Sequence, residues 1–384
     1  MQRGRYGRRS NSEQAQKRDG AISSRHKIRN LWMILNTRRI AVARGVLPHV
    51  RLKRCSRARR RSDFFLQHAA TTITSAWEIY HGASDSNELT SLNNGEGNAT
   101  VLVGSSRTFF DIELPVWERQ SGRRPIQLAL VGTSPLFALE DLAADPNFIG
   151  RVLVGVAPDL FFSGYEYRSG FLKAFQKESP SQRVGKWLSM QLVEPHLAFY
   201  DPDYALFTIL RRQDWPARKG LPGGTEVRKL AISEADRNSY MWSKLETDPD
   251  YRALARRIWA EDFKPLTAKE AAKQQQTIAK QINRAAAVFA RLRARGVPVI
   301  FVRHPSADDY LAYENRDFAR PKTWDVLLAK SGAPGIYFED YQELRNGYEL
   351  PEWSHMTLAS AERYTAELYQ IMERDFAPVD GTRW

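Results

Sequence analysis

The chain has 384 residues, of which 42% are hydrophobic and 26% are charged, a composition typical of a soluble globular protein with one large or two medium domains. Its formal net charge of +13 would suit a nucleic-acid-binding protein, but the charge is unevenly distributed. Residues 1–62 contain 19 of the 57 Lys and Arg and only 2 of the 44 Asp and Glu. This segment therefore has a net charge of +17 and the rest of the chain −4, which argues against nucleic acid as a partner of the folded body.

Residues 1–62 are expected to form a disordered basic leader, because they are rich in Arg and show little apolar periodicity. Three interpretations stay open: a tail that binds nucleic acid or anionic lipid, a targeting segment, and a stretch translated from too early a start. The only cysteine, Cys55, lies in this leader, so the sequence predicts no disulfide within the chain.

The next segment, residues 63–96, combines an apolar stretch with a polar linker. Residues 64–77 are uncharged and follow the basic cluster, which is the charge order of a signal-anchor. They are shorter than the ~20 apolar residues of a membrane-spanning helix, so we expect at most a degenerate anchor, with membrane association through residues 51–80. The polar stretch at 82–99 marks the domain boundary and places the folded domain at 97–384.

Five short apolar runs predict the strands of a buried parallel sheet. They lie at residues 101–104, 126–131, 152–156, 297–302 and 335–338. Helical patterns separate these runs, so the sequence predicts a doubly wound α/β fold with a mostly five-stranded parallel sheet.

Three of the helices have clear sequence signals. Residues 136–144 form an apolar helical pattern, and Thr267 with Glu270 forms a capping box that begins a helix ending near Gly296. The last helix is predicted at about residues 358–374. Residues 163–265 interrupt the alternation and predict a long helical insertion that caps one end of the sheet.

The segment Gly104-Ser105-Ser106-Arg107 directly follows the first predicted strand. Ligands of open α/β sheets bind beyond the carboxyl ends of the strands, so a serine here can face a substrate. The N-terminus of the following helix would favour a developing oxyanion. A simple helix cap is the more common role of a Gly-Ser-Ser turn, and it remains the alternative.

A second motif, Glu352-Trp-Ser-His355, lies just before the last predicted helix. A nucleophilic serine needs a base, and that base needs an acceptor on its other ring nitrogen. Glu352 is three residues before His355 and can reach its Nδ1 atom. A solvated loop histidine is the alternative interpretation.

These two motifs resemble those of the SGNH (GDSL-type) hydrolase family, over about residues 97–377. In that family Gly-Asp-Ser follows the first strand of a flavodoxin-like sheet and Asp-x-x-His precedes the last helix. The resemblance implies that Ser106 is the nucleophile, His355 the general base and Glu352 the residue that orients it. It also implies that the backbone N–H groups of Ser106 and Gly132 stabilise the oxyanion.

The chain also departs from the family pattern at three positions. Ser105 stands where the family has Asp, so either serine can be the nucleophile. Glu352 replaces the family's Asp, as in other known triads. Ala157 replaces the Asn that completes the oxyanion hole, unless Thr133 or Ser134 substitutes for it.

Other residues at the same predicted sheet edge are weaker candidates. Arg107 matches the GSSR variant of the family, whose substrate is unassigned, and Arg303 and His304 end the fourth strand, so all three are candidates for substrate binding. Asp308 and Asp309 can form an acid/base pair or cap a helix. The sequence has no metal-ligand spacing, no Gly-x-Gly-x-x-Gly and no Walker loop, so we expect neither a metal nor another cofactor.

The sequence thus predicts a serine esterase, an O-acyl hydrolase or a related acyltransferase. The resemblance implies an ester substrate on an acylated carbohydrate or a cell-envelope polymer, and a location in the cell envelope. The alternative function is a non-catalytic binding or assembly protein that retains the fold, which Ala157 favours. Nucleic-acid binding through the leader is a third hypothesis.

Overall fold

The computed structural model describes residues 99–166, 168–170, 177, 179–193, 196–197, 206–211, 229–234, 237–377 and 384. The predicted leader at 1–62, the segment at 63–96 and the stretch at 51–80 expected to associate with a membrane lie outside the described residues.

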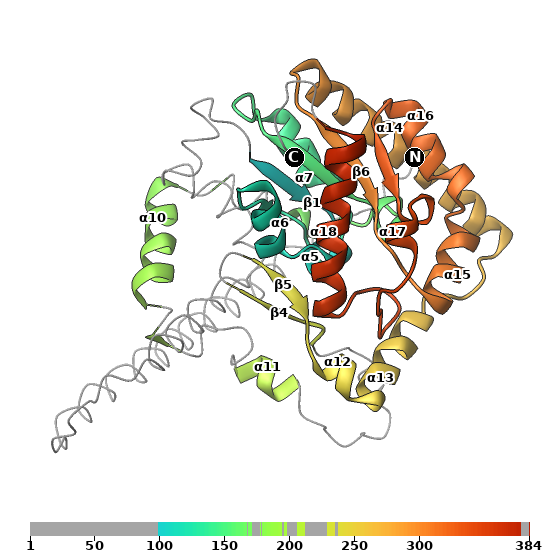
Figure 1. Ribbon diagram of the computed structural model, residues 1–384, viewed down its shortest axis with the longest axis horizontal. Helices are drawn as coiled ribbons and strands as arrows, with labels where there is room; N and C mark the ends of the chain where they lie inside the picture. The colour runs from blue at the N-terminus through green and yellow to red at the C-terminus, as the bar shows by residue number, and fades with distance from the viewer. Residues whose placement is uncertain are drawn as a thin grey trace, which may run out of the picture. The chain divides into compact units, whose positions relative to one another are not determined.

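A five-stranded parallel sheet forms the centre of the described chain (Figure 1). In order across the sheet, its strands are β2 (Ile126–Gln127), β1 (Thr100–Val103), β3 (Arg151–Gly155), β6 (Val299–Arg303) and β7 (Gly335–Tyr337). The order reverses between β1 and β3, and ligands of α/β sheets bind beyond the carboxyl ends of the strands at such a switch point. The predicted α/β fold is confirmed, and each predicted run overlaps one strand of the sheet.

Helices cover both faces of this sheet (Figure 1). One layer consists of α5 (Ser106–Asp111), α6 (Leu114–Ser121) and α18 (Leu358–Asp375). The other consists of α7 (Leu136–Ala144), α14 (Ala268–Ala294) and α16 (Trp324–Ser331). The predicted helices at 136–144 and 358–374 are confirmed, the second with one additional residue. The capping box also forms, because the Thr267 side chain accepts from Glu270 N–H and the Glu270 carboxylate accepts from Thr267 N–H.

Two glycines allow α5 to pack directly on the ends of β1 and β3. A Cβ atom at Gly104 would lie 2.0 Å from Thr108 Oγ1, and a Cβ atom at Gly155 would lie 1.7 Å from the same oxygen. Neither glycine has a positive φ, so both provide space and not an unusual turn. The sequence Gly104-Ser105-Ser106 therefore brings the first turn of α5 close to two neighbouring strands.

The edge strand β2 is shorter than the run predicted at 126–131, although backbone hydrogen bonds from Leu128 N to Leu102 O and from Leu130 N to Gly104 O continue along β1. The Arg237 side chain covers its outer edge by donating to the carbonyl oxygens of Gln127 and Ala129, and its guanidinium lies 4.9 Å from the ring centre of Phe109. Burial, with Arg168 nearby, lowers the pKa of Arg237 to about 9. A charged side chain that occupies these carbonyls protects the edge from pairing with other strands.

The insertion predicted at 163–265 is not purely helical. Its described part contains a two-stranded antiparallel sheet in addition to helices. Its elements are α10 (Pro180–Leu188), a π-helix at Ser189–Val193, α11 (Leu206–Arg211), β4 (Ala231–Ser233), β5 (Ser239–Met241), α12 (Lys244–Thr247) and α13 (Pro249–Ala260). The antiparallel pair is attached to the main layer by the Asn238 side chain, whose oxygen accepts from Leu114 N–H and whose amide nitrogen donates to the Glu113 carboxylate.

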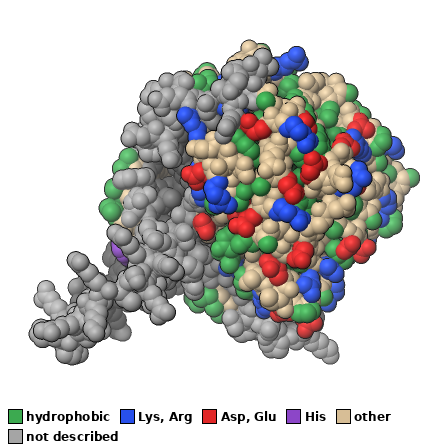
Figure 2. Space-filling model, in the orientation of Figure 1, with side chains coloured by type: hydrophobic (Ala, Val, Ile, Leu, Met, Phe, Trp, Pro, Cys, Tyr) green, Lys and Arg blue, Asp and Glu red, His purple; other side chains and the backbone are tan. Residues whose placement is uncertain are grey.

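The described chain has five further helices: α8 (Pro158–Phe161), α15 (Asp308–Asp317), a 3-10 helix at Arg320–Lys322, another at Phe338–Asp340, and α17 (Gln342–Arg345). On the described surface in Figure 2, Lys and Arg side chains are interspersed with Asp and Glu. Within the described ranges, no helix is long and apolar enough to cross a bilayer.

Candidate functional site

The two serines after β1 have different environments at the start of α5. Ser105 occupies the N-cap position, but its side chain makes no capping hydrogen bond, and its buried Oγ has no partner among the described residues. Ser106 is the first residue of the helix and is partly exposed. The structure therefore does not support a capping role for Ser105. It leaves Ser106 as the more accessible hydroxyl at the carboxyl end of β1.

Glu352 and His355 form a buried acid–imidazole pair in the loop before α18. Glu352 Oε1 lies 2.7 Å from His355 Nδ1 and also accepts from the backbone N–H of His355 at 2.6 Å. The other carboxylate oxygen, Oε2, accepts from Trp259 Nε1 at 2.5 Å. Burial acts to raise the pKa of Glu352, but His355 and Trp259 outweigh burial and hold this pKa below its usual value.

This arrangement determines where a proton can reside on His355. An ionised carboxylate can only accept hydrogen bonds, so Nδ1 of His355 carries a hydrogen and Nε2 is the basic nitrogen when the ring is neutral. Nε2 is buried and has no hydrogen-bond partner within the described part of the chain. The imidazole is thus oriented on one side and available as a base on the other.

Helix α5 brings the serine turn and the histidine loop together. The ring of Phe110 lies 4.8 Å from the imidazole of His355, centre to centre. Ser106 is four residues before Phe110, so both side chains lie on the same face of α5, one turn apart. Arg107 Nε donates to Ser354 Oγ at 3.2 Å, which fixes the neighbour of His355 against the same helix. No hydrogen bond joins Ser106 and His355.

The predicted oxyanion region is only partly equipped with donors. Gly132 has a φ of 67°, a left-handed conformation suited to glycine, in the turn that follows β2. Ala157 is 3% exposed and offers no side-chain donor. Of its two predicted substitutes, Thr133 already donates to Tyr165 O at 3.1 Å, whereas Ser134 Oγ is buried without a partner among the described residues.

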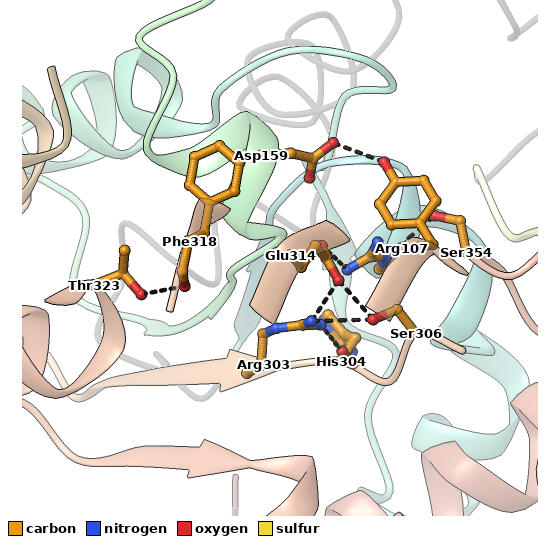
Figure 3. Close-up of polar contacts among 10 residues, drawn as sticks. Arg107, Asp159, Arg303, His304, Ser306, Glu314, Phe318, Thr323 and Ser354 are labelled. Carbon is orange, nitrogen blue, oxygen red and sulfur yellow. Dashed lines mark hydrogen bonds and ion pairs between the residues drawn. The ribbon is translucent and has the colours of Figure 1, made fainter. Parts of the chain in front are cut away.

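Arg107 and Arg303 are not exposed to a substrate in this structure. Both guanidinium groups are 1% exposed and converge on Glu314, at 2.8 and 2.6 Å (Figure 3). Burial acts to raise the pKa of Glu314, but the two arginines hold it below its usual value. Tyr310 packs against the Arg107 guanidinium at 4.8 Å and donates to Asp159 at 2.7 Å. Arg107 and Arg303 therefore form a buried ion-pair cluster with Glu314 at the carboxyl ends of the strands.

His304 is also an interior residue. It is 0% exposed, and its two ring nitrogens lie 3.1 Å from Thr108 Oγ1 and 2.9 Å from Tyr364 Oη. Burial, with Arg107 and Arg303 nearby, lowers the pKa of His304 to about 3, so the ring is neutral at physiological pH. The sequence-based assignment of His304 to substrate binding is not supported, because both nitrogens already have partners.

Three residues around His355 carried no sequence signal. Phe110 and Trp259 contact its ring or its acid partner, as described above. The third is Asp111, which is 0% exposed and accepts from Met356 N–H at 3.0 Å through Oδ1. Burial raises the pKa of Asp111 to about 7, against the opposing effect of His355. Nothing in the local sequence distinguishes these side chains from ordinary core residues.

The remaining candidates give no site. Asp308 and Asp309 are exposed in the first turn of α15, where their negative charges interact favourably with the helix dipole. Among the described residues, no group of three or more His, Cys, Asp or Glu could hold a metal ion.

A scan against protein-family models and searches of curated proteins and of solved structures find no match to this chain.

Proposed function

We propose that this protein is a serine hydrolase of SGNH type that cleaves ester bonds through Ser106, His355 and Glu352. The observation that carries the proposal is the state of His355. Its Nδ1 atom is hydrogen-bonded to a buried carboxylate, its Nε2 atom has no partner among the described residues, and its ring packs one helical turn from Ser106. The strand order, which is that of flavodoxin-like sheets, agrees with the same fold family.

The proposed reaction is acyl transfer in two steps. Ser106 Oγ attacks the ester carbonyl carbon while its proton passes to His355 Nε2. The backbone N–H groups of Ser106 and Gly132 stabilise the oxyanion that forms. The carbon–oxygen bond to the leaving alcohol then breaks, and the alcohol takes the proton from His355. A water molecule hydrolyses the acyl-enzyme by the same route, or an acceptor alcohol takes the acyl group in the transferase variant.

We also propose a substrate class and a location. An O-acyl ester on a carbohydrate or a cell-envelope polymer fits a hydrolase of this type, with a location in the cell envelope, and the reaction requires no cofactor. We do not include Arg107, Arg303 or His304 among the substrate-binding residues, because both arginines are buried and paired with Glu314 and both ring nitrogens of His304 have partners.

A non-catalytic binding or assembly function is the second candidate. Ala157 favours it, because one missing oxyanion donor costs about 10²–10³-fold in rate when nothing replaces it. Thr133 is already engaged with Tyr165, so Ser134 is the remaining side chain of the two that can substitute. The two functions differ in whether Ser106 is activated, which can be measured directly.

The test is covalent labelling of the full chain with a fluorophosphonate, which reacts with activated serines, followed by mapping of the label by mass spectrometry. The hydrolase predicts label on Ser106 that disappears in Ser106→Ala and in His355→Ala. Ser105→Ala is the matched control and should retain the label. A wild-type chain with native circular dichroism that takes up no label would refute the hydrolase and favour the binding protein.

A further inference from the structure

Helix α13, in the insertion, contacts the acid partner of His355. Trp259 lies near the end of this helix and donates from Nε1 to Glu352 Oε2 at 2.5 Å. The opposite oxygen of the same carboxylate, Oε1, faces His355 Nδ1 at 2.7 Å. The Glu352 carboxylate therefore bridges an indole from the insertion and an imidazole from the main domain.

This second donor matters because of the chemistry of a glutamate in that position. The terminal torsion of Glu is broad, so its carboxylate can rotate unless both oxygens are engaged. Glu352 is 0% exposed, and a buried oxygen without a donor would favour protonation of the carboxyl group. A protonated Glu352 would hold the Nδ1 hydrogen of His355 more weakly, and a rotated one would not hold it. Trp259 opposes both changes.

Other contacts hold α13 against the same loop. Arg256, one turn before Trp259, donates from Nε to Pro351 O at 2.8 Å. Its guanidinium lies 4.9 Å from the ring centre of Trp353, a residue with a φ of 74° in the left-handed region. The indole of Trp259 also packs edge-on against Tyr310 at 6.3 Å. The position of Trp259 relative to Glu352 is thus determined by several independent contacts.

We propose that Trp259 is a positioning residue, supplied by the insertion, that keeps Glu352 ionised and turned toward His355. The inference rests on the proposed function for its catalytic consequence. It assigns part of the insertion to the catalytic machinery, a role distinct from covering the substrate.

The central variant is Trp259→Phe in the full chain, which removes the N–H donor and keeps an aromatic ring. Trp242→Phe is the matched control, because Trp242 also belongs to the insertion but packs against Tyr251. The first measurement is the proton NMR signal of the hydrogen shared by His355 Nδ1 and Glu352, assigned by its loss in His355→Gln. Trp259→Phe should shift or broaden this signal, and Trp242→Phe should leave it unchanged.

The second measurement is the rate of fluorophosphonate labelling at Ser106. Trp259→Phe should slow labelling by about 10- to 100-fold, the equivalent of one hydrogen bond to a charged group. In a Glu352→Gln background, the same change should cost almost nothing further, because Phe keeps the ring that packs 6.5 Å from His355 and loses only the hydrogen bond to that carboxylate. Equal slowing in both backgrounds would overturn the inference, as would an unchanged NMR signal in Trp259→Phe.

The two readouts separate this inference from the proposed function. Absence of labelling in the wild type, with an NMR signal that depends on Trp259, would refute the hydrolase and support the positioning role. Normal labelling of Trp259→Phe would refute the positioning role and support the hydrolase.

Discussion

The buried carboxyl group of Asp111 makes the stability of this protein dependent on pH in a direction that can be calculated. Asp111 is 0% exposed, and the hydrogen bond from Met356 N–H engages only one of its oxygens, whereas Oδ2 has no partner among the described residues. Burial raises its pKa from 3.8 to about 7. Among the groups that face it, His355 and Arg107 act in the opposite direction, and Glu352 acts in the same direction as burial.

The sign and size follow from proton linkage. Between about pH 4 and pH 7 the folded chain retains a proton on Asp111 that the unfolded chain has lost, so the free energy of unfolding falls as the pH rises. A shift of about 3 pKa units corresponds to about 4 kcal/mol over the whole interval. Between pH 5 and pH 8.5 the loss should be about 2–3 kcal/mol.

The variant Asp111→Asn isolates this effect. Asparagine keeps an oxygen for Met356 N–H and never ionises, so its advantage over the wild type should increase by about 2–3 kcal/mol from pH 5 to pH 8.5. Urea unfolding followed by circular dichroism at several pH values measures the difference. Asp309→Asn, at an exposed position, is the control and should change by less than about 0.5 kcal/mol. A difference for Asp111→Asn that does not vary with pH would refute the reasoning.

Three further predictions concern a buried ion-pair cluster, a close packing contact and a helix cap. Glu314→Gln removes the charge that Arg107 and Arg303 share in the interior, and should lower the free energy of unfolding in urea by about 3–5 kcal/mol. Gly155→Ala would place a methyl group 1.7 Å from Thr108 Oγ1 and should lower the melting temperature, with part of the loss recovered when Thr108→Ala is added. Thr267→Ala removes the N-cap of α14 and should cost about 1 kcal/mol in thermal unfolding, whereas a cost near zero would show that the cap is dispensable.

Much of the fold could be predicted from local sequence. The buried strands are short apolar runs, and the capping box at Thr267 marks the start of α14 directly. The antiparallel pair β4–β5 was missed because its strands are three residues each and lack alternation of apolar and polar residues. That pair depends on tertiary contacts, such as the Asn238 side chain with Leu114 N, which no local pattern shows.

The candidate site was predictable in position but not in depth. The order of a parallel sheet places the residues after β1 and β6 at one edge, so Ser106, Arg303 and His304 were expected together there. Sequence does not report how deep a side chain lies, and Arg303 and His304 are 1% and 0% exposed. His304 instead fills the space left by Gly155 beside Thr108. The glycine and the histidine are thus two parts of one packing arrangement, 149 positions apart in the chain.

Helix α5 is central to the proposed chemistry because it contacts the histidine loop at three points. On α5, Phe110 and Asp111 lie three and four residues after Arg107. The side chain of Arg107 contacts Ser354, that of Phe110 contacts His355, and that of Asp111 contacts Met356. Each of these contacts would fix the histidine loop against the helix that begins with Ser106, whatever the substrate. Burial raises the pKa of Asp111 to about 7, against the opposing effect of His355, so the charge of Asp111 changes within the pH range of the labelling assay. The pH profile of labelling at Ser106 should therefore differ between the wild type and Asp111→Asn, and identical profiles would show that the charge of Asp111 has no effect on the reaction.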